Sequence, residues 1–98
     1  MDIEKTLDGS RLTLALSGRL DTVTAPDLDN ELKASLGGVE TLSFDFSKLD
    51  YISSAGLRVL LSAQKVMNKQ GSMSLCNVNS SIKEVFDMTG FSDILTIL

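Results

Sequence analysis

Apolar and polar residues alternate in two clear stretches of the chain, and this spacing is typical of β-strands with one buried face. The stretches are residues 12–16, where every second residue is leucine, and residues 41–46, which contain Phe44 and Phe46. We expect their apolar side chains to lie in the core. Elsewhere apolar residues recur every three or four positions, the spacing of a helix with one buried stripe. The three helices predicted in this way cover residues 24–36, 54–69 and 80–89.

Shorter strands are predicted at residues 2–5 and 73–78, and residues 91–97 are expected to form a closing strand or a packed tail. With the closing strand, the order of elements is β-β-α-β-α-β-α-β. The Asp8-Gly9 pair predicts a tight hairpin between the first two strands. Strands that alternate with helices favour a mainly parallel sheet with right-handed crossovers. At 98 residues the chain is long enough for one core. We therefore predict a single α/β domain over residues 1–98, with one mixed sheet of four or five strands.

The junction within residues 49–61 joins a predicted strand to a predicted helix through two serines and two small residues. These are Ser53, Ser54, Ala55 and Gly56. Free backbone N–H groups at a helix start attract an anion such as phosphate. Serine is also a preferred N-cap, so the pair can have a purely structural role. From these residues alone, both interpretations stay open.

The first predicted helix has its own start signals. Thr24 is expected to cap it, Pro26 suits the first turn, and Asp27 stands at the capping-box position. Gly37 and Gly38 are expected to end it.

The composition excludes several classes of protein. The chain has no histidine and one cysteine, Cys76, which excludes histidine-based catalysis, zinc clusters and an internal disulfide. The net charge is −4 and the nine basic residues are scattered, which argues against nucleic-acid binding. No apolar run reaches the roughly 20 residues of a membrane span, and no export signal opens the chain. We therefore expect a cytoplasmic protein without a membrane span.

Carboxylates are the remaining candidates for catalysis. Asp21, Asp45 and Asp50 could meet near one edge of the sheet, where such groups can transfer protons or hold Mg²⁺. Aspartate after a strand is more often a turn or cap residue, and we favour that interpretation. The glycines match neither a P-loop nor a dinucleotide-binding fingerprint. We predict a non-catalytic protein with no cofactor and no metal site.

Two stretches of the chain resemble bacterial anti-sigma factor antagonists, the stand-alone STAS domains. Residues 50–61 (DYISSAGLRVLL) are similar to the family signature, and residues 16–26 (LSGRLDTVTAP) to its first strand-to-helix connection. The resemblance implies a sheet with helices mainly on one face. It also implies binding to an anti-sigma factor that is a serine kinase with a histidine-kinase-like ATPase fold. In that scheme the unphosphorylated antagonist binds the kinase and frees a sigma factor, phosphorylation of a serine at this turn releases the antagonist, and a PP2C-like phosphatase reverses the step.

The family motif commonly places the phosphorylated hydroxyl directly before the glycine, where this chain has Ala55. Either the acceptor is a neighbouring serine or the protein is not switched. We predict Ser54 as the acceptor, because it is the expected N-cap, and Ser53 as the second candidate. The predicted partner surface comprises Asp21, Thr22, Thr24, Ser53, Ser54, Ala55, Gly56 and Arg58.

Two alternative functions remain. A STAS module can regulate another partner, such as a transporter or a signalling enzyme, since partner choice depends on scattered surface residues. Some relatives are thought to bind nucleotides, so a small nucleotide hydrolase is the third hypothesis. The lack of histidine and of a phosphate loop disfavours it.

Overall fold

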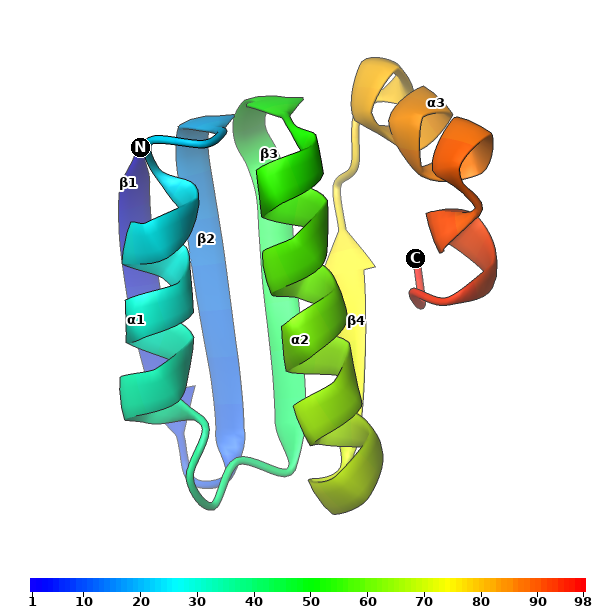
Figure 1. Cartoon of the computed structure of the whole chain (residues 1–98). Helices are drawn as coiled ribbons and strands as arrows, with labels where there is room; N and C mark the ends of the chain where they lie inside the picture. The colour runs from blue at the N-terminus through cyan, green and yellow to red at the C-terminus, as the bar shows by residue number, and fades with distance from the viewer.

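Four strands and three helices make up the fold, with the bounds β1 (Asp2–Asp8), β2 (Arg11–Leu20), α1 (Ala25–Ser35), β3 (Thr41–Ile52), α2 (Ser54–Gln70), β4 (Ser72–Cys76) and α3 (Ser80–Thr89). The computed structural model describes all 98 residues. The sheet order is β1-β2-β3-β4 (Figure 1). β1 is antiparallel to β2, and the other pairs are parallel. The predicted α/β class and mixed sheet are confirmed.

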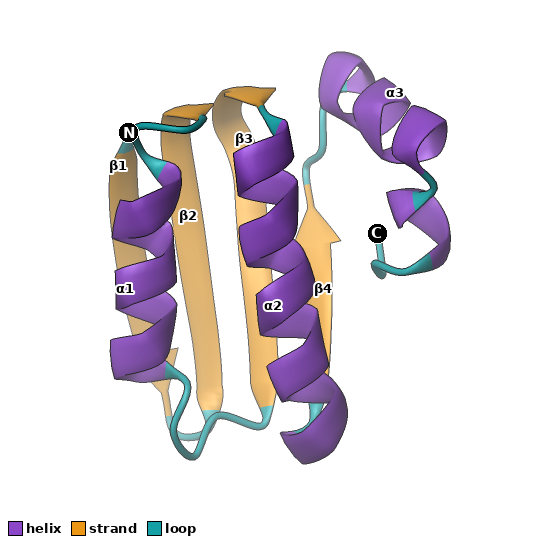
Figure 2. Cartoon of the chain, viewed as in Figure 1, coloured by secondary structure: helices purple, strands orange, loops and turns teal.

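Two of the helices, α1 and α2, lie side by side on one face of the sheet, while α3 lies beyond the end of β4 (Figure 2). The predicted placement of helices mainly on one face is therefore confirmed. The apolar face of the sheet packs against these helices, and the predicted core residues are all fully buried: Leu12, Leu14, Leu16, Phe44 and Phe46. No helix is long and apolar enough to cross a membrane.

The third strand is longer than the alternation of its residues predicts. Its buried positions are two apart up to Phe46 and then three apart, at Leu49 and Ile52. Two register shifts against β2 explain the change, because each bulge inserts one extra residue into β3. β3 therefore runs on to Ile52, and this extension carries the strand up to the serine pair.

Of the two structures expected for residues 91–97, the packed tail is confirmed, since Leu95 is buried and Phe91 and Ile97 pack against the core, and the closing strand is wrong. Phe91–Asp93 form a 3-10 turn after the left-handed Gly90. Only Ile97 forms a bridge, parallel to Leu75 of β4, so the sheet has four strands rather than five. The 3-10 turn takes up Phe91–Asp93, and only Thr96 and Leu98 of the residues after it form backbone hydrogen bonds with β4.

Candidate functional site

Residues 53–56, called the serine turn below, lie at the start of α2. The carboxyl ends of β2 and β3 meet the N-termini of α1 and α2 at this turn, at the top of Figure 1. The Ser53 N–H donates to the Leu20 carbonyl at 2.9 Å, which ties the end of β3 to the end of β2. The Leu57 N–H then donates to the Ser53 carbonyl at 3.0 Å, the first bond of α2. The two strand-to-helix connections therefore form one surface.

The two serines differ in position and exposure. Ser53 has extended backbone angles (φ −101°, ψ 175°) and is the N-cap of α2, while Ser54 is the first helical residue. The prediction that Ser54 is the N-cap is therefore wrong, because the bond to Leu20 fixes the end of the strand at Ser53. The Ser53 hydroxyl is buried and has no hydrogen-bond partner, whereas Ser54 is exposed.

Gly56 allows α2 to pack closely on the ends of the two strands. A Cβ at this position would lie 2.7 Å from Cγ of Leu20 and 2.9 Å from Cγ1 of Ile52, and both of these side chains are buried. No larger residue fits without displacing one of them. Gly56 therefore sets the depth of the helix start, and with it the height of the serine turn above the sheet.

Replacing Gly56 with alanine is expected to lower the free energy of unfolding by about 1–2 kcal/mol. Overpacking costs roughly 1–3 kcal/mol, and the better helix propensity of alanine offsets at most about 1 kcal/mol. Urea unfolding measures the change. Ser62→Ala, at an exposed position of the same helix, is the control and should stay within about 0.5 kcal/mol. Unchanged stability of Gly56→Ala would contradict the tight packing.

The connection from β2 to α1 is braced by its own side chains. Asp21 Oδ1 accepts hydrogen bonds from the N–H groups of Val23 (3.0 Å) and Thr24 (3.1 Å). The Thr24 hydroxyl donates to the Arg19 carbonyl (2.7 Å) and accepts from the Asp21 N–H (2.9 Å). Thr24 occupies the N-cap position but makes no side-chain cap bond. The predicted cap at Thr24 is therefore wrong, because its hydroxyl holds the loop instead.

These contacts also affect the ionisation of Asp21. Hydrogen bonding from the Thr24 backbone is the main reason that the pKa of the Asp21 carboxyl lies below its usual value, with smaller contributions from the Val23 N–H and the charge of Arg19. Arg19 Nε lies 3.6 Å from Asp21 Oδ2. Asp21 is therefore a charged loop brace, as the turn-residue interpretation predicted.

We expect Asp21→Asn to destabilise the protein more at pH 7 than at about pH 3. The folded-state pKa of Asp21 is depressed, so the carboxylate stabilises the fold above its unfolded-state pKa. That stabilisation disappears as the pH falls through the folded-state value. Urea unfolding of both proteins at the two pH values gives the difference, and an equal difference at both would contradict this assignment. Asp2→Asn, at an exposed site in β1, is the control.

The other two candidate aspartates make no hydrogen bond or ion pair at the serine turn. Asp45 lies within β3, where it accepts hydrogen bonds from the Ser47 N–H (2.9 Å) and the Asn77 amide (3.0 Å). The Asn77 bond is the main reason that the pKa of Asp45 is also lowered. Asp50 is exposed. No three His, Cys, Asp or Glu side chains lie close enough to share a metal ion.

Three residues beside the serine turn were missed in the sequence. The Arg19 guanidinium lies 4.1 Å from the centre of the Tyr51 ring, and these residues are register partners on β2 and β3. Val23, at the tip of the neighbouring loop, is 82% exposed. An apolar residue between two threonines was a visible signal for Val23. The Arg19–Tyr51 contact depends on a bulge that the sequence does not reveal.

Several predicted partner residues line one cavity of about 330 Å³ between α1 and α2. Thr22 lies on one side of it, and Ala55 and Arg58 lie on the other. Asp21 and Thr24 brace the loop that carries Thr22. The structure thus brings the predicted residues of both strand-to-helix connections together on one surface.

Comparison with known proteins identifies the family. The STAS domain family matches residues 2–98, so the chain belongs to it. BtrV of Bordetella bronchiseptica, a candidate anti-sigma factor antagonist, is 39% identical over 93% of this chain and 79% of its own length. The anti-sigma-B factor antagonist of Bacillus subtilis is 31% identical over 84% of this chain and 76% of its own.

Solved structures share the same fold. The anti-sigma factor antagonist SpoIIAA superposes with a TM-score of 0.78 in its unphosphorylated form and 0.77 in its phosphorylated form. The sequences are 18% identical, and the match covers 99% of this chain and 87% and 91% of the two SpoIIAA chains. STAS proteins of this kind are regulatory binding domains rather than enzymes.

Proposed function

We propose that this protein is an anti-sigma factor antagonist whose binding to an anti-sigma factor kinase is controlled by phosphorylation of Ser54. Membership of the STAS family and the names of its relatives support the type of partner. The observation that carries the choice of site is the exposed position of Ser54 on the surface shared by the two strand-to-helix connections.

Exposure separates Ser54 from Ser53. A kinase must reach the serine oxygen with its bound ATP, and the Ser53 hydroxyl is buried beneath the turn. Ser54 follows it by one residue and faces solvent. Access to the hydroxyl, rather than helix capping, therefore favours Ser54 as the acceptor.

A phosphate on Ser54 suits a switch that leaves the fold intact. At the first position of α2 the helix dipole favours the added charge of roughly −1.5 to −2. In a docked interface the same charge must lose water or face acidic groups, and about 1.4 kcal/mol of such cost already lowers affinity tenfold. SpoIIAA, which shares this fold, has been solved in an unphosphorylated and in a phosphorylated form.

The proposed partner surface surrounds Ser54. It includes the predicted residues Asp21, Thr22, Thr24, Ser53, Ala55, Gly56 and Arg58, and the structure adds Val23. Val23 is the most exposed large apolar side chain of the protein, and exposed apolar residues beside a polar rim are typical of interface anchors.

Incubation with the cognate anti-sigma factor and ATP is expected to place one phosphate on Ser54, because its hydroxyl is the accessible one at the turn. Tandem mass spectrometry of the digested protein locates the phosphate. Ser54→Ala should abolish labelling, and Ser53→Ala should retain it. A PP2C-like phosphatase should remove the label.

The outcomes separate the candidate functions. Label on Ser53 alone would overturn the choice of serine. No label on either residue, with a kinase that is active on another antagonist, would contradict the phosphorylation switch. Binding to a transporter or signalling enzyme, without any anti-sigma factor, would instead indicate a STAS module of another pathway.

A further inference from the structure

A groove runs between α1 and α2, starting beside the serine turn. Its upper part is the cavity of about 330 Å³ at Ala55 and Arg58, and its lower part is a second cavity of about 360 Å³. The two cavities share Asp29 and Ser62, so they form one continuous depression. The groove therefore connects the proposed partner surface to the far end of both helices.

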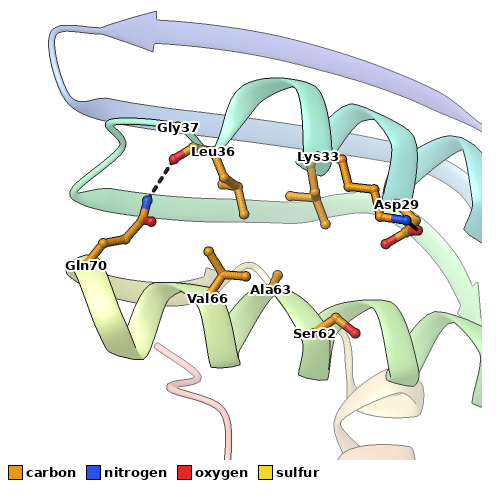
Figure 3. A pocket seen from close by; sticks show the side chains of 9 residues that line it. Asp29, Lys33, Leu36, Gly37, Ser62, Ala63, Val66 and Gln70 are labelled. Atoms are coloured by element: carbon orange, nitrogen blue, oxygen red, sulfur yellow. Dashed lines mark hydrogen bonds and ion pairs between the residues drawn. The ribbon is translucent and has the colours of Figure 1, made fainter.

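The floor of the lower cavity is apolar. Figure 3 shows Leu36 of the α1 end and Val66 of α2 pointing toward each other across the groove. Val66 is 41% exposed, while Ala63, three residues before it on α2, is buried. The Gln70 amide donates to the Leu36 carbonyl at 2.7 Å and closes the lower end. An open trough with an apolar floor is the shape that receives the apolar ridge of another helix.

The two walls of the groove differ in charge. On α1, Lys33 and Asp29 neutralise each other in an ion pair of 2.8 Å. On α2, three basic residues form no ion pair, and α2 contains no acidic residue. Their spacings of seven and four place them on one side of the helix: Arg58, Lys65 and Lys69. Arg58 lines the upper cavity, whereas Lys65 and Lys69 lie outside the cavity lining and each follow a lining residue, Ser62 and Val66, by three positions. The three side chains together are called the basic rim.

This basic rim belongs to a protein with a net charge of −4. α2 alone contributes +3, so the remainder of the chain carries −7 (−4 minus +3). The rim therefore selects an acidic surface, while the rest of the protein repels one.

Arg58 connects this rim to the proposed phosphorylation site. Ser54 and Arg58 are four residues apart on α2, and both are exposed. Side chains at this spacing are neighbours on a helix, with about 5–6 Å between their Cβ atoms. A phosphate on Ser54 can therefore accept hydrogen bonds from the Arg58 guanidinium.

We propose that the groove binds an amphipathic helix of the anti-sigma factor and that the acidic flank of this helix lies along α2. Arg58 pairs with this helix in the unphosphorylated protein and with the Ser54 phosphate in the phosphorylated one. The inference rests on the proposed function and names the partner segment and the means of release. In the unphosphorylated protein Arg58 pairs with a carboxylate of the docked helix. After phosphorylation it pairs with the phosphate, so the acidic flank loses its partner at the mouth of the groove.

The groove is tested by NMR titration of the ¹⁵N-labelled protein with the unlabelled cognate anti-sigma factor. We expect amide shifts to extend from Ala55 along α2 to Val66 and Gln70. Val66→Lys should weaken binding about tenfold or more, because a charge replaces the apolar contact. Lys48→Glu, a charge change at an exposed position in β3, should alter affinity less than twofold. Shifts confined to the serine turn would overturn the docking site.

The role of Arg58 is tested by comparing the phosphorylated and unphosphorylated proteins. We compare the dissociation constant of the phosphorylated protein with that of the unphosphorylated protein. The ratio of the first to the second should be at least threefold smaller in Arg58→Gln than in the wild type, because the Ser54 phosphate can no longer take Arg58 away from the docked helix. Lys65→Gln removes the same charge from the same rim beyond the reach of Ser54, and it should weaken both forms equally. An unchanged ratio in Arg58→Gln would overturn the competition.

These results also distinguish the inference from the function on which it rests. Phosphorylation of Ser54 can release the anti-sigma factor while the amide shifts stay at the serine turn and Arg58→Gln leaves the ratio of dissociation constants unchanged. In that case the inference alone fails. If the unphosphorylated protein binds no anti-sigma factor, the proposed function fails and the inference fails with it.

Discussion

Replacing Ser54 with aspartate is expected to weaken binding of the cognate anti-sigma factor at least tenfold, without destabilising the fold. The new carboxylate lies at the first position of α2, where the helix dipole favours it by about 0.3–1 kcal/mol. In the complex the same charge must be desolvated, and about 1.4 kcal/mol corresponds to the tenfold loss. Isothermal titration calorimetry and thermal unfolding measure the two effects separately.

Ser80 offers a matched control for this variant. It is the first residue of α3, is exposed, and follows an N-cap as Ser54 does. Ser80→Asp therefore adds the same charge at the same helical position, away from the serine turn, and should leave affinity unchanged. Ser54→Ala should bind like the wild type, and its stability should change by less than about 0.5 kcal/mol because Ser54 is not the cap. Equal affinities of the Ser54→Asp and Ser80→Asp proteins would contradict the switch.

Gly71→Ala is expected to be the most damaging small substitution, with a loss of about 3 kcal/mol or more in the free energy of unfolding. A Cβ at Gly71 would lie 1.8 Å from the Glu40 carbonyl oxygen and 2.6 Å from its carbon. That carbonyl cannot easily move, because it accepts a hydrogen bond from the Ser72 N–H at 3.0 Å. Overpacking typically costs about 1–3 kcal/mol, and a clash with backbone lies at or above the upper end of this range.

Thermal unfolding should show a melting temperature lower by roughly 12–24 °C, since each kcal/mol shifts it by about 4–8 °C in a domain of this size. Gly37→Ala is the control, because a Cβ there would have no atom within 4 Å. That variant should be neutral or more stable by up to about 1 kcal/mol. A Gly71→Ala protein as stable as Gly37→Ala would show that the contact with Glu40 can relax.

The sequence predicts the sheet where its residues follow a regular period and fails where tertiary contacts interrupt that period. Alternation in residues 12–16 and 41–46 identifies β2 and the first half of β3. It stops after Phe46, although the strand continues, because the bulges against β2 shift the buried positions to every third residue. The position of a bulge depends on the partner strand, which a single segment does not specify.

The same distinction applies to the candidate site. The order of residues at each connection is enough to predict that both serines, Thr22 and Arg58 lie near the start of α2. The choice of cap is not local, since the bond from Ser53 to Leu20 ends the strand and the Asp21 N–H occupies the Thr24 hydroxyl. The unpaired state of Arg58 likewise follows from what surrounds it in space.

The short pairing of residues 96–98 with β4 affects how the molecule can aggregate. The Leu75 N–H donates to the Thr96 carbonyl, and the Leu98 N–H donates to the Leu75 carbonyl, each at 2.9 Å. Both outward-facing backbone groups of Leu75 are thus already bonded, which blocks addition of a foreign strand at the middle of this edge. Edge-to-edge growth of the sheet is then left to β1, where exposed charges such as Glu4 and Lys5 oppose it.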